Sequence, residues 1–183
     1  MMKPTLWKII RIIGMLFLTL WVMGSAFLHR PSAEEAITSP AEGFFAPDFT
    51  LPDSNGQHYS LADFRGRPVV LTLWASWCSP CKAEMPTFNQ VYEEFGAEQG
   101  MILGVNVTIQ DNLQDVNQFV ADNALSFPIL LDQNGDVAAL YHLRGLPMTF
   151  FITPQGKIDQ VFVGGPLSAA TVRSFFATYS GEE

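Results

Sequence analysis

The sequence predicts an α/β fold in which buried strands alternate with amphipathic helices. Two apolar runs, Val69–Leu73 and Met101–Val107, have the length and composition of buried strands. Segments with helical character follow them, Ala83–Phe95 after the first run and Asp111–Asn123 after the second. Strands that alternate with helices of this length are typical of βαβ units. We therefore expect a central sheet flanked by helices.

The first strand leads to the only two cysteines of the chain, Cys78 and Cys81. Pro80 suits the first turn of a helix, where its missing N–H costs nothing, so Cys78 falls at or just before the helix N-terminus. Unpaired N–H groups and the positive end of the helix dipole lower the pKa of a thiol there and make it a nucleophile. Cys81, three residues on, lies on the same face and can close a disulfide with Cys78. We interpret the pair as redox-active.

Two other interpretations of the cysteines are a static disulfide and half of a metal site. A bridge that closes so small a loop would constrain the unfolded chain little, so it would stabilise the fold poorly. A zinc site would need two more ligands at usable spacing, but the histidines His29, His58 and His142 are scattered along the chain. We expect no metal site, and no cofactor other than the cysteine pair itself.

Before the cysteines, the sequence predicts an N-terminal hairpin. Phe44–Leu51 is expected to be extended, Asn55-Gly56 is a hairpin turn signal, and Gln57–Ser60 is a short returning strand. Ser60 is expected to cap a one-turn helix that ends at Phe64. The phenylalanines of this region are interpreted as core: Phe44, Phe45, Phe49 and Phe64.

After the cysteines, the first helix carries an apolar stripe that predicts its buried face: Met85, Phe88, Val91, Tyr92 and Phe95. Within the second helix, Val116, Phe119 and Val120 are expected to face inward. The remaining expected elements are a strand over Phe127–Leu131, a short helix over Val137–Tyr141, an edge strand over Lys157–Val163 and a closing helix over Ser168–Tyr179 capped by Ser168.

Charge is distributed unevenly along the chain, whose formal net charge is −8. Residues 1–30 carry four basic and no acidic residues, whereas residues 31–183 have a net charge of −12. Nucleic acid is therefore excluded as a partner of the folded part, because phosphate binding relies on cationic patches. We interpret the acidity as a solvated surface.

The N-terminal region predicts a membrane anchor over residues 6–28, a linker over residues 29–42 and a folded domain over residues 43–183. Residues 12–28 contain no charge and nearly span a hydrocarbon core of about 30 Å. Basic residues precede this run, which by the positive-inside bias leaves the N-terminus in the cytoplasm. The alternative is a signal peptide cleaved after Ala26. Either way we expect the domain on the extracytoplasmic side, where disulfides persist.

The segment Trp74-Ala-Ser-Trp-Cys-Ser-Pro-Cys-Lys82 resembles the active site of the thioredoxin superfamily, and Pro86 matches the proline that kinks its first helix. Phe45–Leu51, Gly56 and Ser60–Gly66 extend the resemblance to the TlpA/ResA-like, AhpC/TSA-related branch of membrane-tethered thiol-disulfide oxidoreductases, from Glu42 to the C-terminus. The resemblance implies a thioredoxin fold with a central mixed sheet, an N-terminal β-hairpin and a central strand–helix insertion over Met101–Leu131, preceded by one transmembrane helix.

The same resemblance identifies Gly145–Thr149 as the loop that holds the cis-proline of the superfamily, here Pro147. Its ring would pack near the sulfurs and keep metals out, while the Leu146 backbone would pair with an extended substrate. Trp77 and Pro80 complete the expected substrate-binding residues. Trp74 is expected to pack beneath the active site.

Glu84 is the candidate acid–base group. Thioredoxin places a buried aspartate two residues before the strand tryptophan, but this chain has Thr72 there. Glu84 lies within one helical turn of Cys81, and ResA-like proteins carry a glutamate at this offset. We hypothesise that Glu84 manages the proton of Cys81. The alternative is a solvated acid favoured by the helix dipole.

The resemblance implies that the protein reduces disulfides in exported proteins such as apocytochrome c, recharged by a membrane thiol-electron carrier of the CcdA or DsbD type. The Ser-Pro dipeptide between the cysteines resembles that of reducing members. A peroxiredoxin-type peroxidase is one alternative, although Cys78 lies six rather than three residues after Thr72. A copper-binding assembly factor with His142 is another, although its Cys-x-x-x-Cys spacing would be one residue longer.

Overall fold

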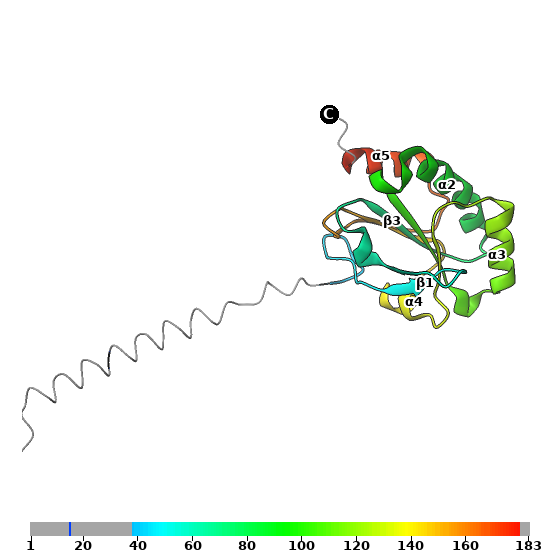
Figure 1. Ribbon diagram of the computed structural model, residues 1–183, viewed down its shortest axis with the longest axis horizontal. Coiled ribbons are helices and arrows are strands. Elements are labelled where there is room, and N and C mark those ends of the chain that lie inside the picture. The colour runs from blue at the N-terminus through cyan, green and yellow to red at the C-terminus, as the bar shows by residue number, and fades with distance from the viewer. Residues whose placement is uncertain (1–14, 16–37, 180–183) are drawn as a thin grey trace, which may run out of the picture. The chain divides into compact units, whose positions relative to one another are not determined.

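The structure is a computed structural model that describes Met15 and residues 38–179 (Figure 1). The chain divides into two units, Met1–Ala36 and Ile37–Glu183, and the description below concerns the second. Apart from Met15, the predicted anchor lies outside the described residues, as does most of the predicted linker. Among the residues described, no helix combines the length and apolarity needed to cross a membrane.

A five-stranded mixed sheet forms the centre of the domain, with the strand order β5-β4-β3-β6-β7. Its strands are β3 (Val69–Trp74), β4 (Met101–Asn106), β5 (Ile129–Leu131), β6 (Met148–Ile152) and β7 (Ile158–Val163). β3 pairs in parallel with β4 and antiparallel with β6, so the strand that leads to the cysteines is the middle strand. The predicted mixed sheet is therefore confirmed.

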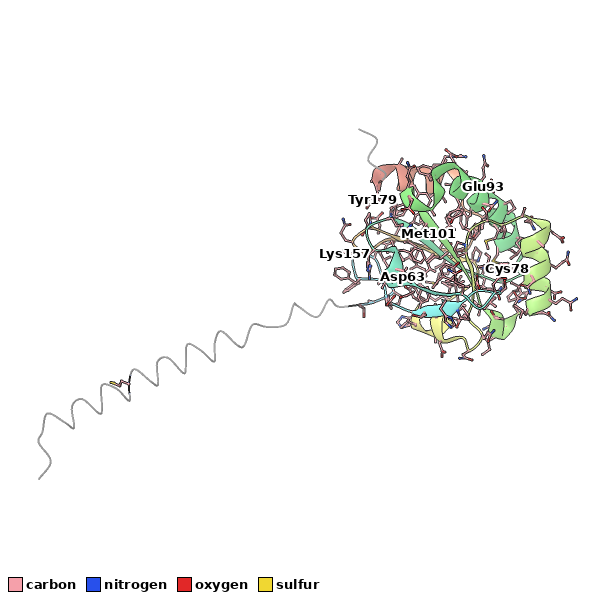
Figure 2. The ribbon with its side chains drawn as sticks, viewed as in Figure 1. Asp63, Cys78, Glu93, Met101, Lys157 and Tyr179 are labelled. Carbon is pink, nitrogen blue, oxygen red and sulfur yellow. A yellow bond between two sulfur atoms is a disulfide. The ribbon has the colours of Figure 1, made fainter. Side chains whose placement is uncertain are left out.

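Helices cover both faces of the sheet. α2 (Ser79–Gln99) and α5 (Ala169–Tyr179) lie together on one side, whereas α4 (Asp136–Leu140) lies on the other (Figure 1). Side chains fill the space between the sheet and these helices (Figure 2). Successive residues of β3 face opposite sides, as expected for a strand, because Leu71 and Leu73 join one hydrophobic cluster and Val70 the other.

The predicted N-terminal hairpin is present. β1 (Thr50–Pro52) pairs antiparallel with β2 (His58–Ser60). Ser60 then caps the short 3-10 helix η1 (Leu61–Phe64) in a capping box with Asp63. Both predictions for this segment, the turn and the cap, are confirmed.

α2 begins at Ser79, which confirms the predicted place of Cys78 at the helix N-terminus, and the amphipathic segment Ala83–Phe95 lies within it. Cys78 is the N-cap, and Pro80 occupies the first turn, where no intrahelical N–H donor is needed. Pro86 lies inside the helix, and Gly96 adopts a positive φ of 72° that interrupts it near its end. The predicted core stripe is confirmed for Met85, Phe88 and Val91, while Tyr92 and Phe95 are half-buried.

The part of the predicted insertion that follows β4, residues 107–128, is called the insertion after β4 and differs in detail from the prediction. A 3-10 helix, η2 (Thr108–Gln110), precedes α3 (Leu113–Asp122), whose N-cap is Asn112. Asp111 therefore lies before the helix rather than at its first position. At the other end of the chain, the Oγ of Ser168 accepts a hydrogen bond of 3.2 Å from the N–H of Thr171, so the predicted cap of α5 is confirmed.

The prediction that Phe44 belongs to the core is wrong, because 42% of this residue is exposed. Phe49 and Phe64 are buried as predicted, and Phe45 is half-buried. The backbone of Phe44 explains the difference. Its carbonyl accepts a hydrogen bond from the N–H of Ile158, so this segment runs along the outer edge of β7. An edge position needs backbone pairing but not a buried side chain.

Candidate active site

Cys78 and Cys81 form a disulfide, with a Cα–Cα distance of 5.3 Å. The Cys78 Sγ accepts a hydrogen bond of 3.3 Å from the backbone N–H of Cys81, as expected for an N-cap side chain. Cys78 is 5% exposed and Cys81 is fully buried. Of the two cysteines, only Cys78 is therefore accessible to a substrate in this oxidised state.

A short turn carries the chain from β3 to the first cysteine. The N–H of Cys78 donates to the carbonyl of Ala75 at 3.1 Å, and the N–H of Lys82 donates to the carbonyl of Cys78 at 3.0 Å. The turn therefore joins the end of β3 directly to the first turn of α2. This fixes Cys78 at the helix N-terminus, where the dipole favours negative charge.

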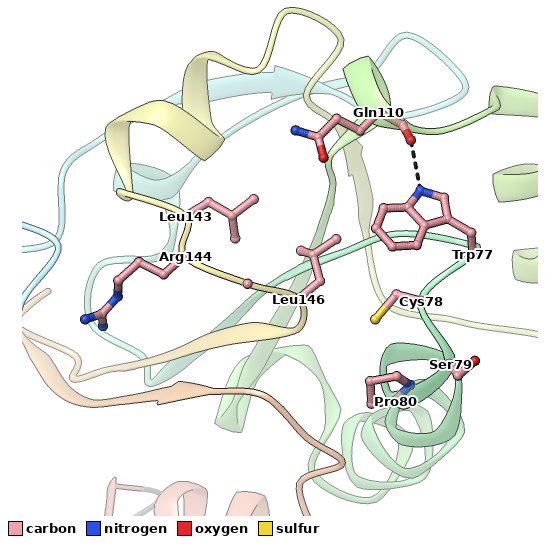
Figure 3. A pocket seen from close by; sticks show the side chains of 9 residues that line it. Trp77, Cys78, Ser79, Pro80, Gln110, Leu143, Arg144 and Leu146 are labelled. Carbon is pink, nitrogen blue, oxygen red and sulfur yellow. Dashed lines mark hydrogen bonds between the residues drawn. The ribbon is translucent and has the colours of Figure 1, made fainter.

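Cys78 opens onto a groove of about 500 Å³ (Figure 3). The groove is lined by Trp77, Cys78, Ser79, Pro80, Gln110, Leu143, Arg144, Gly145 and Leu146. Trp77 is 59% exposed, and its Nε1 donates to the carbonyl of Gln110 at 2.9 Å. The Leu146 side chain points toward Trp77 and Cys78 from the opposite side (Figure 3). The arrangement suits an apolar or extended chain laid beside the disulfide.

The structure thus brings together four predicted residues, Trp77, Cys78, Pro80 and Leu146, along one groove. Gln110, Leu143 and Arg144 also line it and were not predicted. Leu143 and Arg144 could have been found from their closeness to Leu146 in the sequence. Gln110 gives no such signal, because it comes from the insertion after β4.

Pro147 follows a cis peptide bond from Leu146, as predicted. The residue is buried, and its carbonyl accepts a hydrogen bond of 2.8 Å from the N–H of Gly164. A Cβ built on Gly165 would lie 2.9 Å from the Cγ of Pro147. Pro147 therefore follows the groove residue Leu146 directly and contacts the loop between β7 and α5.

Glu84 is fully buried, so the interpretation of this residue as a solvated acid is wrong. Its Oε2 accepts a hydrogen bond of 3.0 Å from the N–H of Leu167, and its Oε1 accepts one of 3.5 Å from the Thr72 hydroxyl. The Thr149 hydroxyl donates in turn to Thr72 at 3.0 Å. Burial raises the pKa of Glu84 to about 7, although both hydrogen bonds oppose this effect. A carboxyl with such a pKa can exchange protons near neutral pH.

Trp74 is fully buried and belongs to the same hydrophobic cluster as both cysteines. Its ring packs against Phe119, with 5.5 Å between ring centroids. This agrees with the predicted place of Trp74 beneath the active site. Phe119 comes from α3, so the insertion after β4 contributes to the support of the site.

Asp111 is a polar residue beside the site that sequence reasoning missed. Its carboxylate accepts hydrogen bonds from both the N–H and the hydroxyl of Ser76, two residues before Cys78. The sequence pattern predicts Asp111 as the first residue of a helix, a position where acidic residues are common. Its actual contacts depend on how the insertion folds back on the end of β3.

Comparison with known proteins provides independent information. The AhpC/TSA family model matches residues 43–161. The thiol-disulfide oxidoreductase ResA of Geobacillus kaustophilus (strain HTA426) is 38% identical over 127 residues, which cover 69% of this chain and 72% of the relative.

Solved structures agree with this match. The crystal structure of StoA from Bacillus subtilis is 30% identical, with a TM-score of 0.63, and the match covers 70% of this chain and 96% of that one. A secreted Mycobacterium tuberculosis disulfide oxidoreductase, described as homologous to E. coli DsbE, is 26% identical with a TM-score of 0.63. That match covers 71% of this chain and 95% of the other.

Proposed function

The chain belongs to the AhpC/TSA family as a thiol-disulfide oxidoreductase of the ResA and StoA type, and on this premise we propose that it reduces disulfides in exported proteins. Its α/β fold is thioredoxin-like, and it is an enzyme. The proposed substrates include apocytochrome c, whose cysteines must be reduced before haem is attached. The enzyme would then serve cytochrome c maturation.

One observation carries the proposed mechanism: Cys78 borders the groove, whereas Cys81 is fully buried. In the reduced enzyme, the Cys78 thiolate attacks one sulfur of the substrate disulfide. A mixed disulfide forms, and the other substrate sulfur leaves as a thiolate that takes up a proton. Only the accessible cysteine can perform this step, because the attacking sulfur must reach the substrate sulfur in line.

Cys81 resolves the mixed disulfide in the second step. Its thiol gives up a proton, and the resulting thiolate attacks the Cys78 sulfur and releases the second substrate thiolate. Two electrons have then passed to the substrate, and the enzyme holds the Cys78–Cys81 disulfide seen here. Glu84, three residues after Cys81 on α2 and with a pKa of about 7, is the group we assign to accept the Cys81 proton.

Substrate binding is assigned to the groove residues Trp77, Pro80 and Leu146, and to Pro147, which follows Leu146 directly. An extended chain can pair with the free backbone groups of Leu146 in the manner of an added strand. Trp77 offers an exposed ring on the other side of Cys78. Such a site recognises a disulfide in an unfolded or extended segment.

We further propose that residues 6–28 anchor the enzyme in the cytoplasmic membrane and that the domain works on the extracytoplasmic side. The uncharged run and the basic residues before it support this placement. A membrane thiol-electron carrier of the CcdA or DsbD type would return two electrons to the Cys78–Cys81 disulfide. Tethering raises the effective concentration of two partners in the same membrane.

The reduction potential of the Cys78–Cys81 pair tests the direction of electron flow. We would measure it in glutathione and dithiothreitol buffers. A value near or below about −270 mV, that of thioredoxin, is expected for a reductant. A value near about −120 mV, typical of strong oxidants, would overturn the proposed reduction of apocytochrome c.

A trapping experiment tests the roles of the two cysteines. Cys81→Ser should accumulate a mixed disulfide with an oxidised Cys-x-x-Cys-His peptide, because the second step is blocked. Cys78→Ser, the matched variant, should accumulate none, because Cys81 is buried. Equal trapping by both variants would contradict the assignment.

The peroxidase alternative is disfavoured by the position of Thr72. In the peroxidase pattern a threonine precedes the reactive cysteine by three residues, whereas the Thr72 hydroxyl here donates to buried Glu84 and accepts from Thr149. We expect no peroxide consumption that depends on Cys78. A peroxide assay with the wild type and Cys78→Ser distinguishes the two functions.

The copper-binding alternative would require His142 to reach the cysteines. His142 is exposed and lines a neighbouring groove with Glu42. Arg144 lines both grooves, but Cys78 lines only the groove described above. We expect no Cu(I) binding that survives a competing chelator. Stoichiometric binding under such competition would revive this alternative.

A further inference from the structure

We propose that Asp111 is a positioning residue that fixes the turn before Cys78, and with it the Trp77 wall of the groove, for attack on disulfides in polypeptides. The inference rests on the proposed nucleophilic role of Cys78. It concerns a carboxylate outside the Cys-x-x-Cys motif that reaches the turn from the insertion after β4.

Both carboxylate oxygens of Asp111 hold Ser76. Oδ2 accepts from the backbone N–H of Ser76 at 2.6 Å, and Oδ1 accepts from its hydroxyl at 2.6 Å. Ser76 is the second residue of the turn that the Cys78 N–H closes on Ala75. Two short charge-assisted bonds to one residue restrict both its backbone and its side chain.

The other two donors to Asp111 tie it to the end of β4. The Asn106 side-chain amide donates to Oδ2 at 2.8 Å, and the Asn112 N–H donates to Oδ1 at 2.8 Å. Asn106 is the last residue of β4 and pairs with Trp74, the last residue of β3. Asp111 therefore joins the carboxyl ends of two neighbouring parallel strands just where the active-site turn begins.

Trp77 is held by the residue next to Asp111. Its Nε1 donates to the carbonyl of Gln110 at 2.9 Å, a bond visible in Figure 3. Consecutive residues of the insertion, Gln110 and Asp111, thus hold consecutive residues of the turn, Trp77 and Ser76. Trp77, which lines the groove, and the turn that leads to Cys78 are therefore held by the same short segment, Gln110 and Asp111.

Asp111 keeps its charge through the pH range in which thiols react. Burial opposes ionisation, but the hydrogen bonds from Ser76, Asn106 and Asn112 outweigh it and lower the pKa of the carboxyl. The hydrogen bonds that the Asp111 carboxylate accepts from Ser76, Asn106 and Asn112 are therefore kept near neutral pH. The function of Asp111 is to hold geometry and not to transfer protons.

The hydrogen bonds of Asp111 should affect the rate of reaction with a polypeptide disulfide more than the rate with a small disulfide. A polypeptide must contact Trp77 and Leu146 while its sulfur meets Cys78, whereas a small aromatic disulfide needs only an accessible sulfur. Loss of a hydrogen bond to a charged group corresponds to roughly a tenfold change in an equilibrium or rate constant. We expect that change to appear in the peptide reaction alone.

The experiment uses the reduced full-length enzyme and two probes, a disulfide-bonded synthetic peptide and 5,5′-dithiobis(2-nitrobenzoate). Asp111→Ala should lower the second-order rate constant for the peptide by roughly tenfold, mainly through a higher half-saturating concentration. The rate with the small disulfide should stay within roughly twofold of the wild type. The rates of both probes falling by the same factor, or neither falling, would overturn the proposal.

Two further variants separate positioning from loss of charge or fold. Asp111→Asn can keep the bond from the Ser76 N–H if its amide oxygen takes the place of Oδ2, so partial rescue is expected. Asp115→Asn removes the same charge four residues on, at an exposed position, and should match the wild type. Failure of Asp111→Asn to recover any peptide rate would show that the bonds to Ser76 are not what matters.

A spectroscopic measurement reports on the groove wall directly. The emission of Trp77 is obtained in the full chain by subtracting the spectrum of Trp77→Phe, made in the same Asp111 background. Asp111→Ala should increase the quenching of this emission by acrylamide, because the ring loses its fixed position. Unchanged quenching would mean that Trp77 does not depend on Asp111, which contradicts the proposal.

Discussion

The N–H of Leu167 donates a hydrogen bond of 3.0 Å to the Oε2 of Glu84, although the two residues are 83 positions apart in the sequence. The loop between β7 and α5 thus covers the carboxyl that follows Cys81 on α2. The bond favours the charged carboxylate, while burial favours the neutral acid. The balance places the pKa of Glu84 at about 7, where small changes in its surroundings alter its protonation.

Replacing Glu84 by Gln should change the pH dependence of mixed-disulfide resolution. In the wild type, the resolution rate should rise as Glu84 ionises through a pKa of about 7, because the carboxylate form accepts the Cys81 proton. Glu84→Gln should remove this rise and lower the rate at pH 8 by roughly tenfold to hundredfold. Stopped-flow release of the second substrate thiol measures the step.

The control for this prediction is Glu98→Gln, which removes an exposed carboxylate from the same helix. Its profile should coincide with that of the wild type. A Glu84→Gln profile that also coincides with the wild type would remove Glu84 from the mechanism.

Leu167→Pro should raise the pKa of Glu84 further. Proline has no N–H, so the carboxylate loses the donor that stabilises its charge. A shift of roughly one pH unit in the resolution profile is expected, toward higher pH. Leu167→Ala is the matched variant, because it also loses the leucine side chain but keeps the donor. Identical profiles for the two variants would disprove the role of this bond.

Glu84 should also make the oxidised enzyme less stable as pH rises. Burial raises the pKa of Glu84 from 4.5 to about 7, so the folded state binds the proton more tightly than the unfolded state. Stability from this group is therefore full below pH 4.5 and is lost between about pH 4.5 and 7. The linked loss amounts to at most about 3 kcal/mol.

Urea unfolding at pH 5 and pH 8 measures this effect, and Glu84→Gln is the comparison. The variant should lose less stability than the wild type between these two pH values. Asp111 does not contribute to this pH-dependent change in stability, because its lowered pKa keeps the carboxylate ionised at both pH values. An equal loss in both proteins would mean that Glu84 does not carry a raised pKa.

The sequence could predict those parts of the site whose placement depends on residues nearby in the chain. Cys78 and Cys81 lie three residues apart beside a helix-starting Pro80, so their placement follows from helix geometry alone. Pro147 could be assigned through the residues around it and the resemblance they carry. The alternation of apolar strands and amphipathic helices likewise predicted a central sheet flanked by helices.

The parts that could not be predicted depend on distant segments. A glutamate near the start of a helix is equally compatible with solvent and with burial, and only the Leu167 loop decides that Glu84 is buried. Asp111 resembles an ordinary helix-start acid until the insertion folds back onto Ser76. The wrong assignment of Phe44 has the same origin, because an edge pairing with Ile158 decides its exposure.

Gly165→Ala should destabilise the enzyme through the same loop that covers Glu84. A Cβ at this position would lie 2.6 Å from the Glu84 Oε2 and 2.9 Å from the Pro147 Cγ, closer than such contacts allow. Overpacking of this kind costs about 1–3 kcal/mol of unfolding free energy, measured by urea denaturation. Gly145→Ala is the control, because its Cβ would meet only Val163 at 3.8 Å, an ordinary contact. Equal unfolding free energies of the two variants would mean that the loop accommodates the added Cβ and is not tightly packed against Glu84 and Pro147.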